Sequence, residues 1–291
     1  MTLPVVETRV CYPSGHTETA ATVLHVEPRA DGRLAVLLDT TTVHPVDAGW
    51  PDQGPDRAVL RAPRLAAELP VVDCIVGATD GSSLYLGGDI PVPKGTPGWA
   101  FVVAHLVEGP AAPAEGDTVE VAVDAGYRQR MSAGHTICHL ASLALNRALS
   151  DRWKKEARPD ALGNPDFDGS AIDVSLIGEN GSVDTYRLGK SLRRKGFVTE
   201  GFVEALPEIE AAVNAALAEW VASGATVRVD ADGPGLTDRR YWVCELPGRS
   251  ARIPCGGTHV TSLAGLGAVR VRLSTTDADG TTVLTMETVA G

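Results

Sequence analysis

The sequence predicts an α+β protein built from two domains: a small β domain at the N-terminus and a longer domain in which helices pack on an antiparallel sheet. Three observations support this prediction. Short apolar runs broken by turn residues fill roughly the first hundred positions, two long helical periodicities follow, and β-branched runs close the chain. Helices segregated to one face of a mostly antiparallel sheet are the expected outcome of that order.

The N-terminal region is predicted to form a small antiparallel β-barrel. Its strand signals are TAATVLHVEP (19–28), GRLAVLLDTT (32–41) and AFVVAHLVEG (100–109). Dense turn sequences, DAGWPDQGPD and GGDIPVPKGTPG, separate them. The Pro- and Ala-rich stretch PAAPAEGDTVE is of low complexity, so we expect one domain over residues 1–112 and a second over 118–291.

The second region begins with helical periodicity. Residues 135–150 carry Ile137, Leu140, Ala144 and Ala148 at helical steps. Another helix is predicted over 206–224, with Pro207 in its first turn, Gly224 at its end, and an apolar stripe formed by Ile209, Val213, Leu217 and Trp220. Four strand signals follow: ATVRVDA (225–231), RRYWVCEL (239–246), GAVRVRLST (267–275) and TTVLTMETV (281–289).

Composition excludes several classes of protein. The chain has 291 residues, 44% of them hydrophobic, and a formal net charge of −11. This charge argues against DNA and against sequence-independent coating of nucleic acid, which requires basic proteins. The N-terminus MTLPVVETRV lacks the basic start of a signal peptide, and no apolar run is long enough for a membrane helix. Five scattered cysteines do not form a disulfide framework, so a cytoplasmic protein is expected.

Local basic clusters leave room for RNA binding. WKKEAR carries Lys154, Lys155 and Arg158, and GKSLRRKG carries Lys190, Arg193, Arg194 and Lys195. Arg239 and Arg240 form a third cluster. For any single cluster, a solvated surface that binds nothing is the favoured interpretation.

Two short stretches repeat the same spacing of soft metal ligands. MSAGHTICHLASLAL places His135 and His139 four residues apart, where a helix points both side chains the same way. RIPCGGTHV places Cys255 and His259 at the same step, and Gly256 and Gly257 permit a turn that brings both round to one point. Three imidazoles and a thiolate form a tetrahedral set typical of Zn²⁺, whereas Ca²⁺ and Mg²⁺ prefer oxygen. The second domain is therefore expected to carry a zinc site.

Familiar zinc enzymes do not fit these motifs. A zincin needs a glutamate directly after the first histidine, but Thr136 stands there. A nucleobase deaminase needs a second cysteine three positions after the first, but Thr258 stands there. Cys138 would point away from the face shared by the histidines, so it is expected in the core.

HTICHLASLA followed by PCGGTHV resembles the editing domain of alanyl-tRNA synthetase and its free-standing relatives, the AlaX proteins. A related domain in threonyl-tRNA synthetase carries a variant of the second motif. The order of elements is also similar over most of the chain. The CGGTHV run carries most of the resemblance, because a lone H-x-x-x-H occurs in many proteins.

One loop departs from the family pattern. The chain has VHPVDAGWPDQG where relatives usually have a proline, a glutamate, three glycines and a glutamine. Asp47 and Ala48 replace glycines, and Trp50 stands at the position of the glutamine. In the family this loop lies near the editing pocket, so the change favours a shifted substrate; drift in a loop that needs only a turn is the alternative.

The resemblance implies hydrolysis of the ester between a mischarged amino acid and the acceptor end of a tRNA, in trans and with zinc. Thr136 and Thr258 would offer hydroxyls to the substrate, or would bond only the local backbone. Asp47 would contact the amine of the amino acid or support the metal ligands. Trp50, Gly256 and Gly257 would lie against the substrate, and tRNA would be bound by Lys190, Arg193 and Arg194.

Several alternatives stay open at this stage. Serine or glycine on alanine tRNA is the default substrate, because a pocket for a small apolar side chain rejects an added hydroxyl poorly. The altered loop also admits a threonine analogue on threonine tRNA, as in the fluorothreonyl-tRNA deacylase branch. Because four protein ligands usually mark a structural zinc, an RNA-binding module without catalysis is a rival. A zinc hydrolase of a small-molecule ester is another, and the chain could be a monomer or a homodimer.

Overall fold

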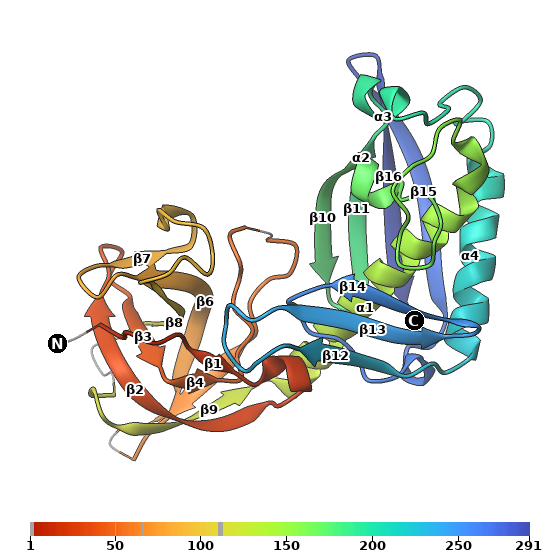
Figure 1. Cartoon of the computed structure of the whole chain (residues 1–291). Helices are drawn as coiled ribbons and strands as arrows, with labels where there is room; N and C mark the ends of the chain where they lie inside the picture. The colour runs from red at the N-terminus through yellow and green to blue at the C-terminus, as the bar shows by residue number, and fades with distance from the viewer. Residues whose placement is uncertain (1–2, 50, 64, 66, 110–112) are drawn as a thin grey trace. The chain divides into compact units, whose positions relative to one another are not determined.

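The computed structural model describes residues 3–49, 51–63, 65, 67–109 and 113–291. The chain folds into two compact units (Figure 1). The first comprises Met1–Arg128, Val229–Arg240 and Cys255–Thr258, and the second comprises Gln129–Arg228, Tyr241–Pro254 and His259–Gly291. The predicted boundary at 112–118 precedes strand β9 (Thr118–Val123), which pairs with strands of the first unit. The first unit therefore runs on past that point.

A seven-stranded antiparallel sheet forms most of the first unit. Its order is β5-β9-β2-β3-β8-β6-β7, and an additional pairing of β5 with β6 joins six of the strands into a ring. The remaining bounds are β2 Glu18–Pro28, β3 Leu34–Leu38, β5 Ala58–Arg61, β6 Leu69–Thr79, β7 Leu84–Leu86 and β8 Ala100–Val107. Two short strands, β1 (Arg9–Val10) and β4 (Thr40–Thr41), pair in parallel. The three strand signals recognised in this region correspond to β2, to β3 with β4, and to β8.

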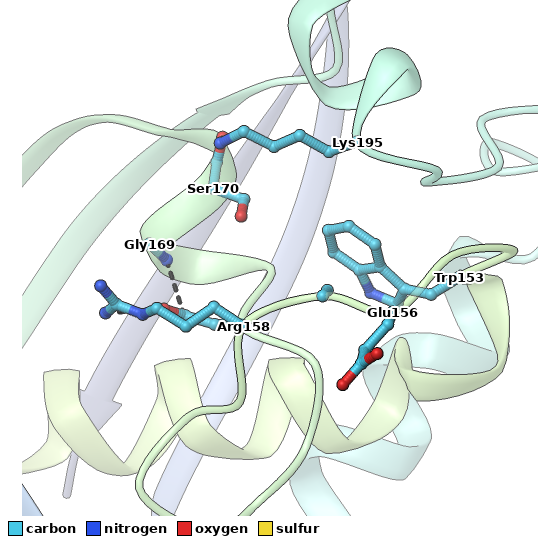
Figure 2. Close-up of a pocket in the computed structure, with 8 residues that line it drawn as sticks. Trp153, Glu156, Arg158, Gly169, Ser170 and Lys195 are labelled. Atoms are coloured by element: carbon cyan, nitrogen blue, oxygen red, sulfur yellow. Dashed lines mark hydrogen bonds and ion pairs between the residues drawn. The ribbon is translucent and has the colours of Figure 1, made fainter.

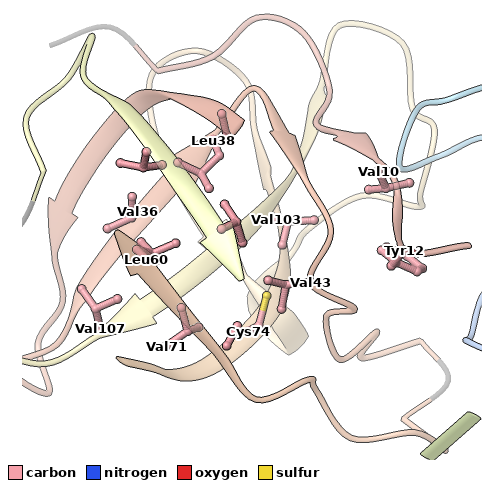
Figure 3. Close-up of a cluster of buried hydrophobic side chains, with 14 of the residues drawn as sticks. Val10, Tyr12, Val36, Leu38, Val43, Leu60, Val71, Cys74, Val103 and Val107 are labelled. Carbon is pink, nitrogen blue, oxygen red and sulfur yellow. The ribbon is translucent and has the colours of Figure 1, made fainter. Parts of the chain in front are cut away.

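The core of the first unit lies inside this ring of strands (Figure 3). Alternate residues of each strand point inward, so valines and leucines from all sides meet there. Val36, Leu60, Val103 and Val121 are each fully buried. Burying such a side chain contributes about 1.5–3 kcal/mol to the stability of the folded state. The alternation of side chains between the two faces of each strand places these residues in one core.

Two buried histidines should make the first unit sensitive to acid. Burial lowers the pKa of His44 and of His105 from 6.5 to about 4. The neutral ring of His105 donates from Nδ1 to the Val36 carbonyl at 3.1 Å and accepts at Nε2 from the Thr41 hydroxyl at 2.8 Å. A second proton would break the latter bond.

We expect the free energy of unfolding to fall between pH 6.5 and pH 4. The unfolded chain takes up these protons near pH 6.5 and the folded chain only near pH 4, so stability is complete above 6.5 and is lost as pH falls. Each histidine should cost about 2 kcal/mol at pH 5. His105→Gln keeps a donor and an acceptor and should reduce this dependence by about that amount in urea titrations at pH 7 and pH 5. An unchanged pH dependence in this variant would contradict the assignment.

The second unit is an α+β layer arrangement. A four-stranded antiparallel sheet has the order β10-β11-β16-β15, and α1 and α4 pack against it (Figure 1). A three-stranded sheet has the order β12-β13-β14. The bounds are α1 Ala125–Ala148, α2 Asp168–Ala171, α3 Lys190–Arg194, α4 Leu206–Ala222, β10 Ile172–Gly178, β11 Gly181–Arg187, β12 Val227–Ala231, β13 Arg240–Leu246, β14 Arg249–Pro254, β15 Val269–Ala278 and β16 Thr281–Ala290.

Helix α4 protects the edge of the four-stranded sheet. Its predicted stripe of Ile209, Val213, Leu217 and Trp220 is buried. Two polar side chains of the same helix bond the open edge of β15: the Asn214 amide makes two 2.8 Å hydrogen bonds with the backbone of Val271, and the Glu210 carboxylate accepts from Leu273 N at 2.7 Å. These bonds occupy backbone groups that would otherwise be exposed for pairing with another strand.

Helix α1 lies very close to the β10–β11 hairpin. It begins at Ala125, ten residues before the predicted start, and carries Gly134 directly before His135. A Cβ atom on Gly134 would collide with the carbonyl oxygens of Gly178 and Gly181. Because Gly134 has no side chain, the helix can approach the β10–β11 hairpin closely just before His135.

Candidate metal site

The structure brings the four predicted metal ligands together. One ligand atom from each of His135, His139, Cys255 and His259 can be chosen such that all four atoms lie within 4.8 Å of one another. The imidazole centroids are 4.9 Å apart for His135 and His139, 4.4 Å for His135 and His259, and 5.2 Å for His139 and His259. This group, called the His₃Cys cluster below, could hold one metal ion.

Helix α1 and the segment that follows β14 supply the ligands. His135 and His139 lie one turn apart on α1, so their side chains project from the same face. Cys255 directly follows β14, and its backbone N–H donates to the Arg240 carbonyl at 3.0 Å. His259 comes four residues later, beyond the two glycines.

The turn between Cys255 and His259 does not depend on left-handed glycines. Neither Gly256 nor Gly257 has a positive φ, and a Cβ atom on Gly256 would meet no described atom within 4 Å. The backbone N–H of Gly257 instead donates to Cys255 Sγ at 3.5 Å. A donor at this position stabilises the thiolate form in which a cysteine binds a metal.

Hydrogen bonds select the tautomer of His259. The Thr136 hydroxyl donates to the Ser132 carbonyl at 2.8 Å, so its oxygen is left to accept. It accepts from the Val260 N–H at 3.2 Å, and His259 Nδ1 lies 3.2 Å away. Nδ1 therefore carries the proton, and Nε2 is the ring nitrogen with a lone pair that could bind a metal.

The remaining donors also suit a cation. His139 Nε2 is buried and has no hydrogen-bond partner among the described residues, an arrangement that costs free energy unless a ligand fills it. Burial lowers the pKa of His139 to about 4, which keeps its ring neutral at pH 7. Burial raises the pKa of the Cys255 thiol to about 12, so its thiolate needs a compensating positive charge. Nitrogen and sulfur donors of this kind fit zinc.

One aromatic and one polar side chain that the sequence analysis does not predict also support the cluster. The fully buried Trp242 of β13 lies 5.1 Å from His139 and 6.0 Å from His259, ring centre to ring centre. The buried amide of Gln53 makes two bonds to Thr258: Nε2 donates to Oγ1 at 3.0 Å, and Oε1 accepts from the backbone N–H at 3.3 Å. Gln53 lies three residues after Trp50, which stands at the position of the family's glutamine. The presence of a glutamine so close to that position was the sequence signal that could have identified Gln53.

Removing this amide should loosen the turn that carries Cys255 and His259. We expect Gln53→Ala to lower the free energy of unfolding by about 1–3 kcal/mol, because a buried donor and acceptor on Thr258 lose their partners. Metal affinity should fall about 10- to 100-fold, as for other groups that orient ligands. Competition with a chromogenic chelator measures the second effect. Gly256→Ala is the control, because it changes the same turn at a position where the added Cβ atom would meet no described atom within 4 Å. Equal effects of the two substitutions would refute the role of Gln53.

The predicted catalytic hydroxyls are occupied within the protein. Thr136 is fully buried and bonds Ser132, Val260 and His259, and the Thr258 hydroxyl accepts from Gln53. Their direct contact with a substrate stays a prediction, whereas their support of the ligand-bearing segments is visible. Cys138 lies apart, with Sγ 3.5 Å from Oδ1 of the buried Asp184.

The other predicted substrate residues do not belong to the His₃Cys cluster. Asp47 is half-exposed and pairs with Lys94 at 3.1 Å. Lys190, Arg193 and Arg194 lie on α3, which follows the Arg187 end of β11. The Gly181 end of the same strand lies beside Gly134, next to His135. Six steps along β11 measure about 20 Å, so these cations cannot touch a group bound at His135. Trp50 lies outside the described residues.

Comparison of the sequence with models of known protein families, and with functionally characterised proteins, gives no match. No helix among the described residues has both the length and the apolar character needed to cross a membrane.

Proposed function

We propose that the protein is a zinc-dependent aminoacyl-tRNA deacylase that acts in trans and hydrolyses the ester between a mischarged small amino acid and its tRNA. The observation that carries the proposal is the His₃Cys cluster, assembled from an H-x-x-x-H helix and a C-G-G-T-H turn. The resemblance of these two motifs to the editing domains of alanyl- and threonyl-tRNA synthetases supplies the reaction.

The residues of the chain would act mainly by positioning. Thr136 holds the His259 ring in the tautomer that directs Nε2 to the ion, and Gln53 holds the turn through Thr258. When bound, zinc supplies a Lewis acid that polarises a carbonyl oxygen. An ester is already activated, so orientation and charge stabilisation are sufficient without a covalent step on the enzyme.

The choice of amino acid follows from a general limit of apolar pockets. A synthetase that selects alanine rejects serine poorly, because an added hydroxyl costs little binding free energy. Serine on alanine tRNA is therefore the first candidate, and glycine is the second. The divergent loop at 44–54 supports a third candidate, a threonine analogue such as fluorothreonine on threonine tRNA.

The number of candidate metal-binding side chains favours one alternative function, an RNA-binding module with a structural zinc. Four donors complete a tetrahedral set, and such closed sites are usually structural. A zinc-stapled RNA-binding module would have the same cluster and would release no amino acid. A hydrolase of small esters would turn over its substrate without any tRNA.

A panel of charged tRNAs separates these functions. Alanine tRNA carrying serine, glycine or alanine, and threonine tRNA carrying threonine, serine or fluorothreonine, would be incubated with protein, and release of the amino acid followed in time. We expect rapid release from one mischarged member and none from the correctly charged partner. Binding without release from any member would leave the RNA-binding module, and equal hydrolysis of a free aminoacyl methyl ester would leave the small-ester hydrolase.

A further inference from the structure

The structure joins two basic segments that are 30 residues apart in the sequence. Trp153 and Phe197 form an antiparallel β-bridge, and Lys154 N donates to the Gly196 carbonyl at 2.9 Å. The Lys155 ammonium group donates to the Arg194 carbonyl at 3.1 Å. WKKEAR and GKSLRRKG are therefore parts of one surface of the second unit.

The junction between the segments requires close backbone approach. Gly196 has a φ of +105°, which favours glycine, and a Cβ atom at this position would lie 2.7 Å from the Lys155 Cβ. Trp153 packs edge-on against Phe197 with their ring centres 5.3 Å apart. These contacts hold the two segments side by side.

The joined surface is strongly positive. Seven exposed cations belong to it, and they are named the basic surface here: Lys154, Lys155, Arg158, Lys190, Arg193, Arg194 and Lys195. Glu156 is the only acidic residue within segments 153–158 and 189–196. Such a concentration contrasts with the net charge of −11 for the whole chain, so the surface stands out as a place where an anion is favoured.

A cavity of about 320 Å³ opens within the basic surface (Figure 2). Trp153 and Glu156 border one side and Ser170 with Lys195 another, and Arg158 completes the rim. The indole N–H of Trp153 is a buried donor without an acceptor among the described residues. A ligand with acceptor oxygens would complement the Arg158 and Lys195 side chains that line the cavity.

Acidic neighbours do not cancel this charge. Asp166 also lines the cavity, but it is buried and accepts from Arg158 at 3.2 Å and from Gly169 N at 2.9 Å. The Arg158 side chain is still 84% exposed. Glu156 is the one exposed carboxylate among the cavity residues, so neutralising it tests whether the charge at the cavity controls anion binding.

We propose that the basic surface binds the sugar–phosphate backbone of the tRNA acceptor stem, with one phosphate group seated in the cavity. This inference rests on the proposed function for the identity of the RNA. The end of β11 that leads to α3 is about 20 Å from the end beside Gly134. A stem whose terminal ester lies at the His₃Cys cluster would thus meet the basic surface several nucleotides away.

Binding of uncharged tRNA tests the inference separately from hydrolysis. Affinity would be measured by fluorescence anisotropy over a range of salt concentrations for the wild type, Lys154→Glu, Lys195→Glu and Glu156→Gln. Arg270→Glu, on an exposed position of β15, is a control with the same change in charge as the two lysine variants. Thermal melting would confirm that each variant is folded.

We expect each lysine reversal to weaken binding at least about 5-fold and to reduce the salt slope by about one, as for loss of a phosphate contact. Glu156→Gln should strengthen binding, and Arg270→Glu should change it less than 2-fold. Equal affinities for all variants would overturn the inference, as would binding of adenosine monophosphate or anionic vesicles without binding of tRNA. If the variants follow this pattern but no charged tRNA is hydrolysed, the inference stands and the deacylase proposal fails.

Discussion

Substitution of His139 by Ala should abolish both the zinc binding and the aminoacyl-tRNA hydrolysis that we propose for this protein. Nε2 of His139 is buried and without a hydrogen-bond partner among the described residues, and the low pKa keeps the ring neutral at pH 7, so we propose that this nitrogen binds the metal. Loss of a group that only orients a ligand costs about 10- to 100-fold in metal affinity, and loss of the ligand itself should cost more. We therefore expect zinc content below one tenth of the wild-type value and a rate of hydrolysis reduced more than about 100-fold.

Cys138→Ala provides a matched control on the same helix. Its sulfur contacts the Asp184 carboxylate rather than the cluster, so metal content should stay at one ion per chain. Mass spectrometry under native conditions measures both variants in one experiment. Full occupancy in His139→Ala, or loss of zinc from Cys138→Ala alone, would show that the ion is bound elsewhere.

Asp56→Ala should destabilise the first unit by about 3–5 kcal/mol, because it leaves a buried arginine without its counter-charge. The Arg128 and Asp56 side chains are 6% and 1% exposed. Arg128 Nε donates to Asp56 Oδ1 at 2.7 Å, and a second nitrogen donates to the Thr42 carbonyl at 2.7 Å. Asp56 also accepts from His44 N at 2.5 Å, so the pair fixes both ends of the divergent loop.

A double-mutant cycle distinguishes this cause from a simple loss of packing. Asp56→Ala combined with Arg128→Met removes both charges, and the double variant should be more stable than Asp56→Ala alone. Urea denaturation followed by circular dichroism provides the free energies of unfolding. A single Asp56→Ala cost below about 1 kcal/mol would mean that the buried arginine is accommodated in another way.

The sequence predicts the elements with strong local patterns. Helix α4 was predicted over 206–224 and is found at Leu206–Ala222, since its apolar stripe and terminal glycine are local signals. The start of α1 was predicted ten residues late, because GYRQRMSAG is polar and gains helical structure by packing on the β10–β11 hairpin through Gly134. Strands β10, β11 and β14 were not predicted; each depends on pairing with a neighbouring strand rather than on its own composition.

The candidate site follows the same division. Residue type and spacing predict all four metal ligands, and the structure brings these residues together. The contact between Gln53 and Thr258 joins residues 205 positions apart, so the sequence indicates at most that a glutamine lies near the expected position and not which residue it contacts. The basic segments were predicted as separate clusters because only the Trp153–Phe197 bridge makes them one surface.

Zinc titration into metal-free protein, followed by hydrolysis of the best charged tRNA from the panel, tests the proposed metal-dependent deacylase most directly. We expect no release above the uncatalysed rate before zinc is added, a linear rise in rate as zinc is added, and saturation at one equivalent per chain. Full activity of the metal-free protein, or a protein that binds one zinc ion and still releases no amino acid, would contradict a metal-dependent deacylase.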